Sequence, residues 1–364
     1  MVYQQLGVRP VINASATLTK LGGSLMPEPV VEAIREASGS FIDLHELQDL
    51  AGKRIAELTN NEACYISSGA AAGITLSVAT CIAGVEPDDR MVFPALDGYE
   101  RNEVLCRPEQ YNGYRYSADI TGAKIVEVGG DLDDFIGAIN SRTACILWFA
   151  GKLSENSPPL EDVIREAKKL RVPVIVDAAA QIPPLSSLWY FTKELGADAA
   201  IFSGGKGLRG PQTTGLVLGR SDIIQGCRNH GAPNHAIGRP MKVSKEDMAG
   251  AVAAMEWSLK QDEPATLQRY EDIVQFWIDG VRDLPGVTAE RGFPSEAGQP
   301  HPRAILHLGP EAKLNRNQLV ERLWNRNPRI AVSEDEQIAV ALNPQTIQEG
   351  EEKLVLEAIG EELE

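Results

Sequence analysis

One lysine in this sequence stands in an unusual setting for a turn residue. Residues 202–212 read Phe-Ser-Gly-Gly-Lys-Gly-Leu-Arg-Gly-Pro-Gln, so glycines surround Lys206 and the hydroxyl of Ser203 lies close by. Apolar runs at 197–202 and 215–219 predict that this loop joins two buried strands. Glycines permit tight bends and the close approach of a flat ligand, and a lysine held there suits a Schiff base with an aldehyde cofactor. A solvated lysine in a glycine-rich hairpin is the alternative interpretation.

An aspartate upstream offers a second chemical group. The apolar run 172–176 ends at Asp177, which is followed by three alanines that leave room beside it. A carboxylate at the end of a buried strand costs free energy unless a positive group meets it. A protonated pyridine nitrogen is such a group, and an aspartate at that nitrogen keeps pyridoxal phosphate an electron sink. A turn or N-cap aspartate is the alternative here.

A run of small residues supplies the third piece. Residues 67–71, Ser-Ser-Gly-Ala-Ala, follow a short apolar segment at 63–66 and lead into a helix. Free backbone amides at a helix N-terminus bind phosphate groups, although small residues there also permit close packing of the helix on a sheet. Taken together, the three pieces match the phosphate, the ring nitrogen and the aldehyde of pyridoxal phosphate. We therefore expect this cofactor.

The elements that must position these groups alternate between strand and helix. An amphipathic helix at 160–170 separates two of the apolar runs. Apolar strands spaced by helices predict an α/β fold whose mostly parallel sheet is covered on both faces and binds ligands beyond the carboxyl ends of its strands. The strands expected are 63–66, 104–106, 124–128, 145–149 and 172–176.

The alternation of predicted strands and helices ends at about residue 220. Residues 229–240 form a loop rich in Gly, Pro, Asn and His, and Ser244 and Asp247 have the spacing of a capping box that opens a long helix. Mixed strands and helices follow. We predict an N-terminal segment and large cofactor-binding domain over 1–263, and a smaller α+β domain over 264–364 that also packs with the N-terminal segment.

The amino-acid composition limits which binding partners and which cellular location we expect for this protein. The 364 residues carry a net charge of −16, which argues against nucleic-acid binding through a basic surface but leaves room for a local basic pocket that takes an anionic small molecule. The five cysteines form no CxxC pair and no metal-ligand spacing, so reduced thiols, no metal and a cytoplasmic location are expected. We see no signal peptide and no apolar window of membrane-spanning length, so no membrane partner is expected.

The motifs also resemble those of a known family. The segments at 9–17, 176–177 and 202–212 are similar to those of fold-type I pyridoxal-phosphate enzymes of the bacterial selenocysteine synthase (seryl-tRNA selenium transferase) group, over most of the chain. The resemblance implies a fold-type I transferase fold, with Lys206 as the lysine that carries the cofactor and Asp177 as the partner of its ring nitrogen. The phosphate ligands that it implies are Ser68, Gly69, Ala70 and Ser203.

Two departures from that group bear on function. The tRNA-dependent members carry an added N-terminal domain, whereas here the catalytic region begins almost at Met1, so we do not expect selenium transfer onto seryl-tRNA. The shorter members include ammonia-lyases of the D-glucosaminate-6-phosphate type, which the chain resembles more closely. Relatives often stack a histidine on the cofactor ring, but residues 107–111 read Arg-Pro-Glu-Gln-Tyr, so Gln110 or Tyr111 is expected in that place.

These observations predict α,β-elimination on a small 2-amino acid of the 3-hydroxy or sugar-acid type, phosphorylated or not. An arginine should bind the substrate carboxylate, with Arg239 as the first candidate and Arg209 as the second. An aminotransferase or racemase would use the same Lys206, Asp177 and Ser203, and a non-catalytic protein that binds pyridoxal phosphate is a further alternative. Because fold-type I relatives work as dimers, the resemblance also implies a homodimer.

Overall fold

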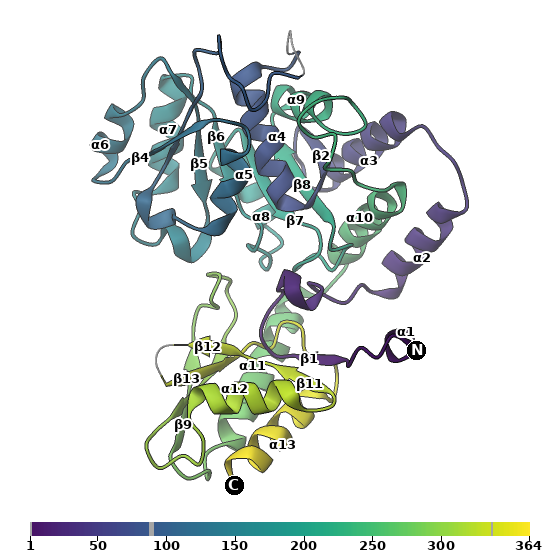
Figure 1. Ribbon diagram of the computed structural model, residues 1–364, viewed down its shortest axis with the longest axis vertical. Coiled ribbons are helices and arrows are strands. Elements are labelled where there is room, and N and C mark those ends of the chain that lie inside the picture. Colours follow the sequence, from purple (N-terminus) through teal and green to yellow (C-terminus); the bar gives the residue numbers. More distant parts are fainter. Residues whose placement is uncertain (1, 87–90, 336–337) are drawn as a thin grey trace. The chain divides into compact units, whose positions relative to one another are not determined.

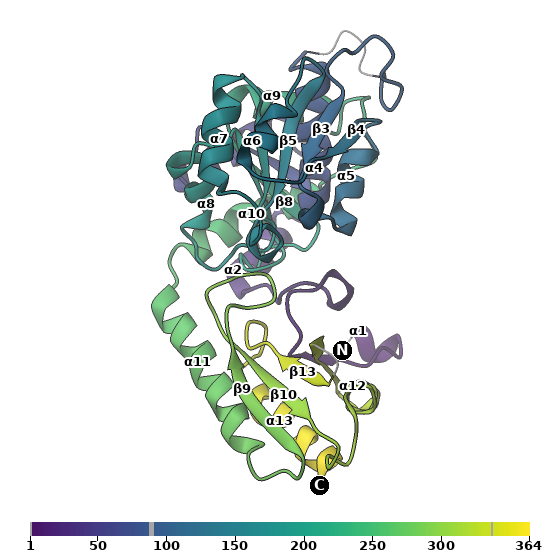
Figure 2. The same ribbon diagram turned by 90° about the vertical axis from the view of Figure 1, so that its left-hand side faces the viewer.

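The computed structural model describes residues 2–86, 91–335 and 338–364. The chain forms two compact units (Figures 1 and 2). One unit is Met26–Lys260, and the other joins the residues up to Leu25 with Gln261–Glu364.

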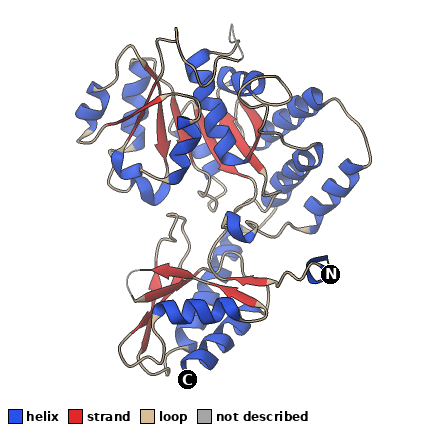
Figure 3. Ribbon diagram, viewed as in Figure 1, coloured by secondary structure: helices blue, strands red, loops and turns tan. Residues whose placement is uncertain are grey.

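The described residues of the first unit form a seven-stranded sheet in the order β2-β8-β7-β6-β5-β3-β4. Figure 3 draws the strands in red and the helices in blue. Strand β8 runs antiparallel to both of its neighbours, and the other pairings are parallel. The prediction of a mostly parallel sheet is therefore confirmed. The strands are β2 (Ala63–Ser68), β3 (Glu103–Cys106), β4 (Lys124–Glu127), β5 (Thr143–Phe149), β6 (Val174–Asp177), β7 (Ala199–Ser203) and β8 (Thr214–Gly219).

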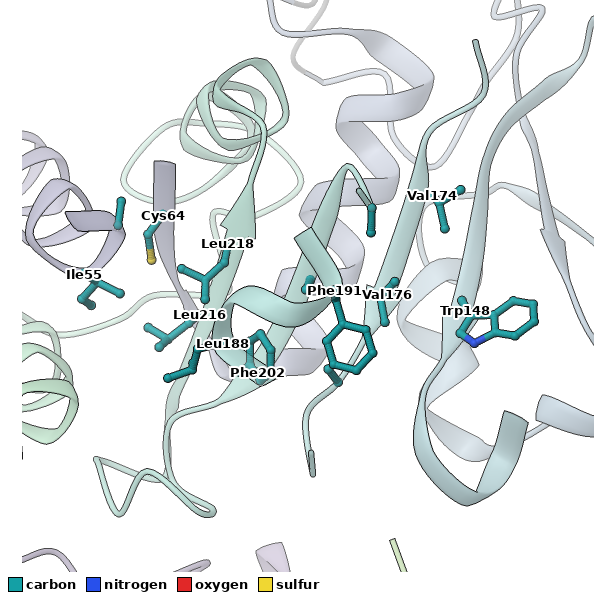
Figure 4. Close-up of a cluster of buried hydrophobic side chains, with 14 of the residues drawn as sticks. Ile55, Cys64, Trp148, Val174, Val176, Leu188, Phe191, Phe202, Leu216 and Leu218 are labelled. Atoms are coloured by element: carbon teal, nitrogen blue, oxygen red, sulfur yellow. The ribbon is translucent and has the colours of Figure 1, made fainter. Parts of the chain in front are cut away.

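Helices cover both faces of this sheet, as expected for a parallel α/β arrangement. Because side chains alternate along a strand, Val174 and Val176 enter one core and Ile175 enters the other; Phe202 and Ile201 divide in the same way. Figure 4 shows the first of these cores. The helices of this unit are α2 (Glu28–Ser38), α3 (Leu44–Leu58), α4 (Gly69–Ala83), α5 (Tyr116–Asp119), α6 (Leu132–Gly137), α7 (Leu160–Lys169), α8 (Ser187–Trp189), α9 (Ser221–His230) and α10 (Lys245–Ser258), with shorter turns η2 (Pro108–Gln110), η3 (Gly113–Arg115), η4 (Gly151–Ser154) and a π-helical η5 (Tyr190–Glu194).

The helix expected after Ser244 begins there, but only half of the capping box forms. The Ser244 hydroxyl oxygen accepts a hydrogen bond from the backbone N–H of Asp247 at 3.0 Å. The Asp247 carboxylate accepts instead from the Thr213 hydroxyl at 2.7 Å, which ties the start of α10 to the turn before β8.

The second unit is α+β, as predicted for the smaller domain. Its described residues form an antiparallel sheet in the order β12-β13-β10-β9 and a parallel pair, β1 with β11. The strands are β1 (Val11–Asn13), β9 (Val287–Gly292), β10 (Arg303–Leu308), β11 (Arg329–Ala331), β12 (Ser333–Asp335) and β13 (Ala339–Leu342), and the helices are α1 (Val2–Gln5), η1 (Thr19–Leu21), α11 (Glu263–Gly280), α12 (Arg316–Asn325) and α13 (Glu351–Leu363).

The N-terminal segment groups with this unit because of its strand pairing. Strand β1 lies in register with β11, and Ile12 and Ala14 are buried in the same core as Trp277. The structure thus groups the segment with the C-terminal residues rather than with 26–260, and the boundary falls after Lys260 rather than at residue 263. All five cysteines are free thiols. None of the helices in the described ranges combines the length and apolar character that a bilayer span requires.

We predict that Phe202→Ala lowers the free energy of unfolding by about 3–5 kcal/mol, because the ring is fully buried beside Phe191 and its loss leaves a cavity. Phe41→Ala is the matched control, since Phe41 is fully exposed. Urea unfolding followed by tryptophan fluorescence measures both. Equal effects of the two substitutions would contradict the assigned core.

Candidate active site

The sheet brings the predicted residues to one edge. Strands β2, β6 and β7 are parallel to one another and end at Ser68, Asp177 and Ser203 respectively. Strand β8 lies between β2 and β7 with Gly215 in register with both Ser67 and Ser203. Since neighbouring strands lie about 4.8 Å apart, the backbones of β2 and β7 are roughly 10 Å apart at this edge.

The N-terminus of α4 offers backbone donors at the same edge. The helix begins at Gly69, and the Ser68 side chain makes no capping hydrogen bond. The Ser67 hydroxyl donates to the Gly69 carbonyl oxygen at 2.9 Å instead. The first amides of α4 are therefore not capped by the side chain at its N-cap, and Ser68, Gly69 and Ala70 are partly exposed. Such a helix start suits a phosphate group.

Gly215 allows this helix start to approach the sheet. A Cβ atom at Gly215 would collide with the carbonyl carbon and oxygen of Gly69 and would lie 2.6 Å from the Ala70 nitrogen. Only glycine fits there without moving the α4 N-terminus. The sequence analysis did not single out Gly215, although a glycine within an apolar strand is a signal of close backbone approach.

The loop that carries Lys206 is held by backbone hydrogen bonds. The Gly204 N–H donates to the Thr214 carbonyl and the Gly210 N–H donates to the Gly204 carbonyl, each at 2.8 Å. The Arg209 N–H donates to the Lys206 carbonyl at 3.0 Å. Gly207 packs so closely that a Cβ atom would collide with the Ile182 carbonyl oxygen. Lys206 therefore stands on a packed turn and not at the tip of a free hairpin.

Asp177 is the electrostatic centre of this edge. It is 9% exposed, and its Oδ1 accepts a hydrogen bond from the Ala179 N–H at 2.9 Å. Burial raises the pKa of the Asp177 carboxyl, while the Ala179 hydrogen bond and the positive charge of Lys206 oppose that rise. Lys206 therefore lies close enough for its charge to lower the pKa of Asp177. Because that pKa is still raised overall, a second positive group beside the carboxylate would stabilise its ionised form.

The two candidate arginines lie in different settings. Arg209 has a left-handed backbone (φ 56°), and its guanidinium lies 5.3 Å from the centre of the Trp257 ring. Arg239 lies exposed on the loop between α9 and α10, and no described contact of its side chain reaches Asp177, Ser203 or Lys206. The role of either arginine in substrate binding stays a prediction.

Gln110 takes part in a network at the end of β5. Its buried amide oxygen accepts from the Phe149 N–H at 3.0 Å, and its Nε2 donates to the Ser157 hydroxyl at 3.1 Å. Tyr111 is 65% exposed, and the Arg115 guanidinium lies 4.4 Å from its ring centre. Gln110 thus fixes the strand end next to β6, and stacking of either residue on a cofactor ring stays a prediction.

The residues at this edge fit pyridoxal phosphate. The helix start of α4 suits the phosphate, Gly215 leaves the space that a side chain would fill, and the desolvated Asp177 suits a protonated ring nitrogen. Lys206 supplies an amine beside that carboxylate.

Comparison with known proteins agrees with this geometry. The family model for aminotransferase class-V matches residues 46–235, more than half of the chain. The chain belongs to the aminotransferase class-V family. It has the fold of the fold-type I enzymes, and this family typically uses pyridoxal phosphate.

Individual relatives carry different activities. A 5'-C-glycyluridine monooxygenase-decarboxylase from a Streptomyces species is 31% identical over 325 residues, 86% of this chain and 78% of that protein. The D-glucosaminate-6-phosphate ammonia lyase of Salmonella typhimurium is 29% identical over 99% of this chain and 97% of its own. A solved structure of a D-glucosaminate-6-phosphate ammonia-lyase superposes with a TM-score of 0.84 at 28% identity, covering 100% of this chain and 99% of that one.

The resemblance to the selenocysteine synthase group is also confirmed. The L-seryl-tRNA(Sec) selenium transferase of Serratia proteamaculans is 25% identical over 281 residues, which cover 69% of this chain and 57% of that enzyme.

We predict that Asp177→Asn stabilises the cofactor-free protein at neutral pH, because it removes a desolvated carboxylate. Since the pKa of Asp177 is higher in the folded than in the unfolded chain, wild-type stability falls as pH rises from the unfolded value through the folded value. The stabilisation by Asp177→Asn should therefore become smaller as the pH falls below the pKa that Asp177 has in the folded chain. Thermal unfolding across pH measures this, with exposed Asp283→Asn as the control. A pH-independent gain would contradict it.

We predict that Gly215→Ala costs about 1–3 kcal/mol of stability, because the methyl group must displace Gly69 and Ala70. The same displacement should weaken binding of pyridoxal phosphate. Gly137→Ala in α6 is the matched control, since a Cβ atom there meets open space. Urea unfolding and cofactor titration measure both variants. An unchanged cofactor affinity in Gly215→Ala would contradict a role of Gly215 in shaping the predicted phosphate site.

Proposed function

We propose that this protein is a pyridoxal-phosphate-dependent lyase. It performs α,β-elimination on a small 2-amino acid with a hydroxyl at C3, of the 3-hydroxy or sugar-acid type, phosphorylated or not, and yields a 2-oxo acid and ammonia. The observation that carries the proposal is the meeting of Lys206, Asp177 and the α4 N-terminus at one sheet edge. The similarity to D-glucosaminate-6-phosphate ammonia lyase over nearly the whole length of both chains supports the reaction type.

Each part of the cofactor has a partner in this proposal. In the absence of substrate Lys206 would hold the aldehyde carbon, and the Asp177 carboxylate would pair with the ring nitrogen. When bound, pyridoxal phosphate supplies an electron sink for the pair that remains after the α-proton is removed. The α4 N-terminus would hold the phosphate, with Ser68, Gly69, Ala70 and Ser203 as its ligands.

The residues of the chain then have distinct roles. The Lys206 amine removes the substrate α-proton, and its position on a packed turn limits the directions in which it can reach. The Asp177 carboxyl, whose pKa is raised by burial, would be kept ionised by a protonated ring nitrogen beside it. Arg239 or Arg209 binds the substrate carboxylate. The hydroxyl at C3 leaves with a proton as water, and a water molecule is taken up again when ammonia is released.

The relatives named above favour two different reactions. The monooxygenase-decarboxylase has the higher identity, and the ammonia lyase has the higher coverage. An oxygen-dependent decarboxylation is therefore the second candidate, beside transamination and racemisation, which use the same lysine. We also propose that the protein acts as a homodimer on a small-molecule substrate.

The test is a screen of the cofactor-loaded protein with D- and L-2-amino-3-hydroxy acids and phosphorylated sugar acids, D-glucosaminate 6-phosphate included. Ammonia and 2-oxo acid should form without any amino acceptor. Lys206→Ala should lower kcat roughly 1,000-fold because it removes the proton-transfer group, whereas Lys260→Ala on the exposed surface should retain activity. Borohydride reduction followed by peptide mass mapping should locate the cofactor on the peptide that holds Lys206.

The alternatives have their own readouts. Products that form only with a 2-oxo acid acceptor would identify an aminotransferase, and loss of optical activity without ammonia would identify a racemase. Oxygen uptake with release of carbon dioxide would identify the second candidate. Turnover that survives Lys206→Ala would refute the assigned lysine.

A further inference from the structure

A cavity of about 520 Å³ opens at the opposite edge of the seven-stranded sheet, where β6 and β7 begin and β8 ends. Its apolar wall includes Val172, Pro173 and Ala197. Strand β7 runs from this edge to Ser203, and five residues at about 3.3 Å each place the cavity roughly 16 Å from the catalytic edge. A ligand here would leave Lys206 accessible.

The lining of this cavity is basic in a chain whose net charge is −16. Among its described lining residues, the carboxylates are Glu62 and Asp198. The cations come from several separate segments: Arg101 precedes β3, Lys168 and Arg171 lie at the end of α7, Lys193 lies in η5 and Arg220 follows β8.

Both carboxylates are already engaged. Asp198 accepts a hydrogen bond from the Val174 N–H at 2.8 Å and forms an ion pair with Arg220. Glu62 accepts from the Ser221 N–H at 3.1 Å. Hydrogen bonds from Ser221 lower the pKa of Glu62, and the charge of Lys193 contributes to that lowering.

The remaining cations are in excess. Across the described ranges, Lys168, Arg171 and Lys193 form no ion pair, and Arg101 donates through Nε to the Thr143 carbonyl at 3.1 Å. A second cavity of about 450 Å³ shares Arg101, Arg171 and Val172 with the first, so the basic lining continues along the sheet edge.

Helix stabilisation accounts for only part of this charge. Lys168 and Lys169 complement the negative end of the α7 dipole. Arg171 ends the same helix in a left-handed conformation (φ 57°), and the Arg171 and Val172 N–H groups donate to the Lys168 and Ala167 carbonyls. Glycine is the usual residue at that position, and a side chain there costs about 1 kcal/mol. Lys193 and Arg101 lie outside this helix.

We propose that the cavity is a binding site for a small organic anion that carries at least two negative charges, best met by a phosphorylated metabolite. Its volume falls in the range of small-molecule sites, roughly 300–1,000 Å³. Arginine binds phosphate oxygens in pairs, and lysine adds point charges around them. The apolar wall of Val172, Pro173 and Ala197 accommodates the carbon skeleton.

The test is isothermal titration of the cofactor-loaded protein with inorganic tripolyphosphate as the probe. Lys168→Ala/Arg171→Ala/Lys193→Ala should weaken binding about tenfold or more. The control Lys260→Ala/Lys313→Ala/Lys353→Ala removes the same charge from exposed positions outside the cavity and should change affinity less than about twofold. Circular dichroism checks the folding of both variants. Arg171→Lys alone keeps the charge but loses the paired donors, so it should weaken binding less than the triple cavity variant does.

Several outcomes would overturn the proposal. Equal losses in the two triple variants would indicate diffuse attraction rather than a site. Unchanged affinity in the cavity variant would place the probe elsewhere, for example at the α4 N-terminus, and absence of binding to the wild type would refute the site. An oligonucleotide that binds more tightly than tripolyphosphate would contradict a small-molecule ligand. None of these results depends on which reaction occurs at Lys206.

Discussion

The arrangement of the catalytic edge depends on one desolvated carboxylate. Asp177 ends the central strand β6, where β5 and β7 flank it on both sides, so water has little access to it. Folding raises the pKa of this carboxyl, so ionising it costs more free energy in the folded chain than in the unfolded chain. Lys206 and the Ala179 N–H relieve it only in part. A positively charged ligand that binds the folded state would relieve the rest, so the proposed function couples cofactor binding to stability through Asp177.

The sheet topology brings the ends of three strands, β2, β6 and β7, to the same edge as Asp177. Because β8 runs antiparallel between β2 and β7, the ends of β2 and β7 face the same edge although one strand separates them. The glycine at 215 then lets α4 begin against that strand. The α4 N-terminus, the Lys206 turn and Asp177 are therefore placed by backbone geometry, whereas the arginines proposed to bind substrate lie on loops.

Local sequence patterns predict most of the helices and strands. The features that they do not predict depend on contacts between residues far apart in the sequence. The predicted strand 172–176 begins two residues later, because the Val172 N–H donates to the Ala167 carbonyl and Pro173 has no N–H to donate. The insertion of β8 beside β2 depends on pairing with distant residues, and so does the membership of β1 in the second unit. The role of Gln110 depends on Phe149 and Ser157, which no window around residue 110 contains. Lys206, Asp177 and the small residues after β2 were visible because glycines and alanines mark them in sequence.

The placement of β8 has a consequence for biosynthesis. Among the strands of the described residues, β2 pairs only with β8, and the pair Ile66–Leu216 joins residues 150 positions apart. A nascent chain therefore emerges from the ribosome with β2 unpaired until β8 has also been made. During that interval the apolar residues Cys64, Tyr65 and Ile66 lack their neighbouring strand. The proposed phosphate-binding end of the site is thus the first part to be synthesised and among the last to be assembled.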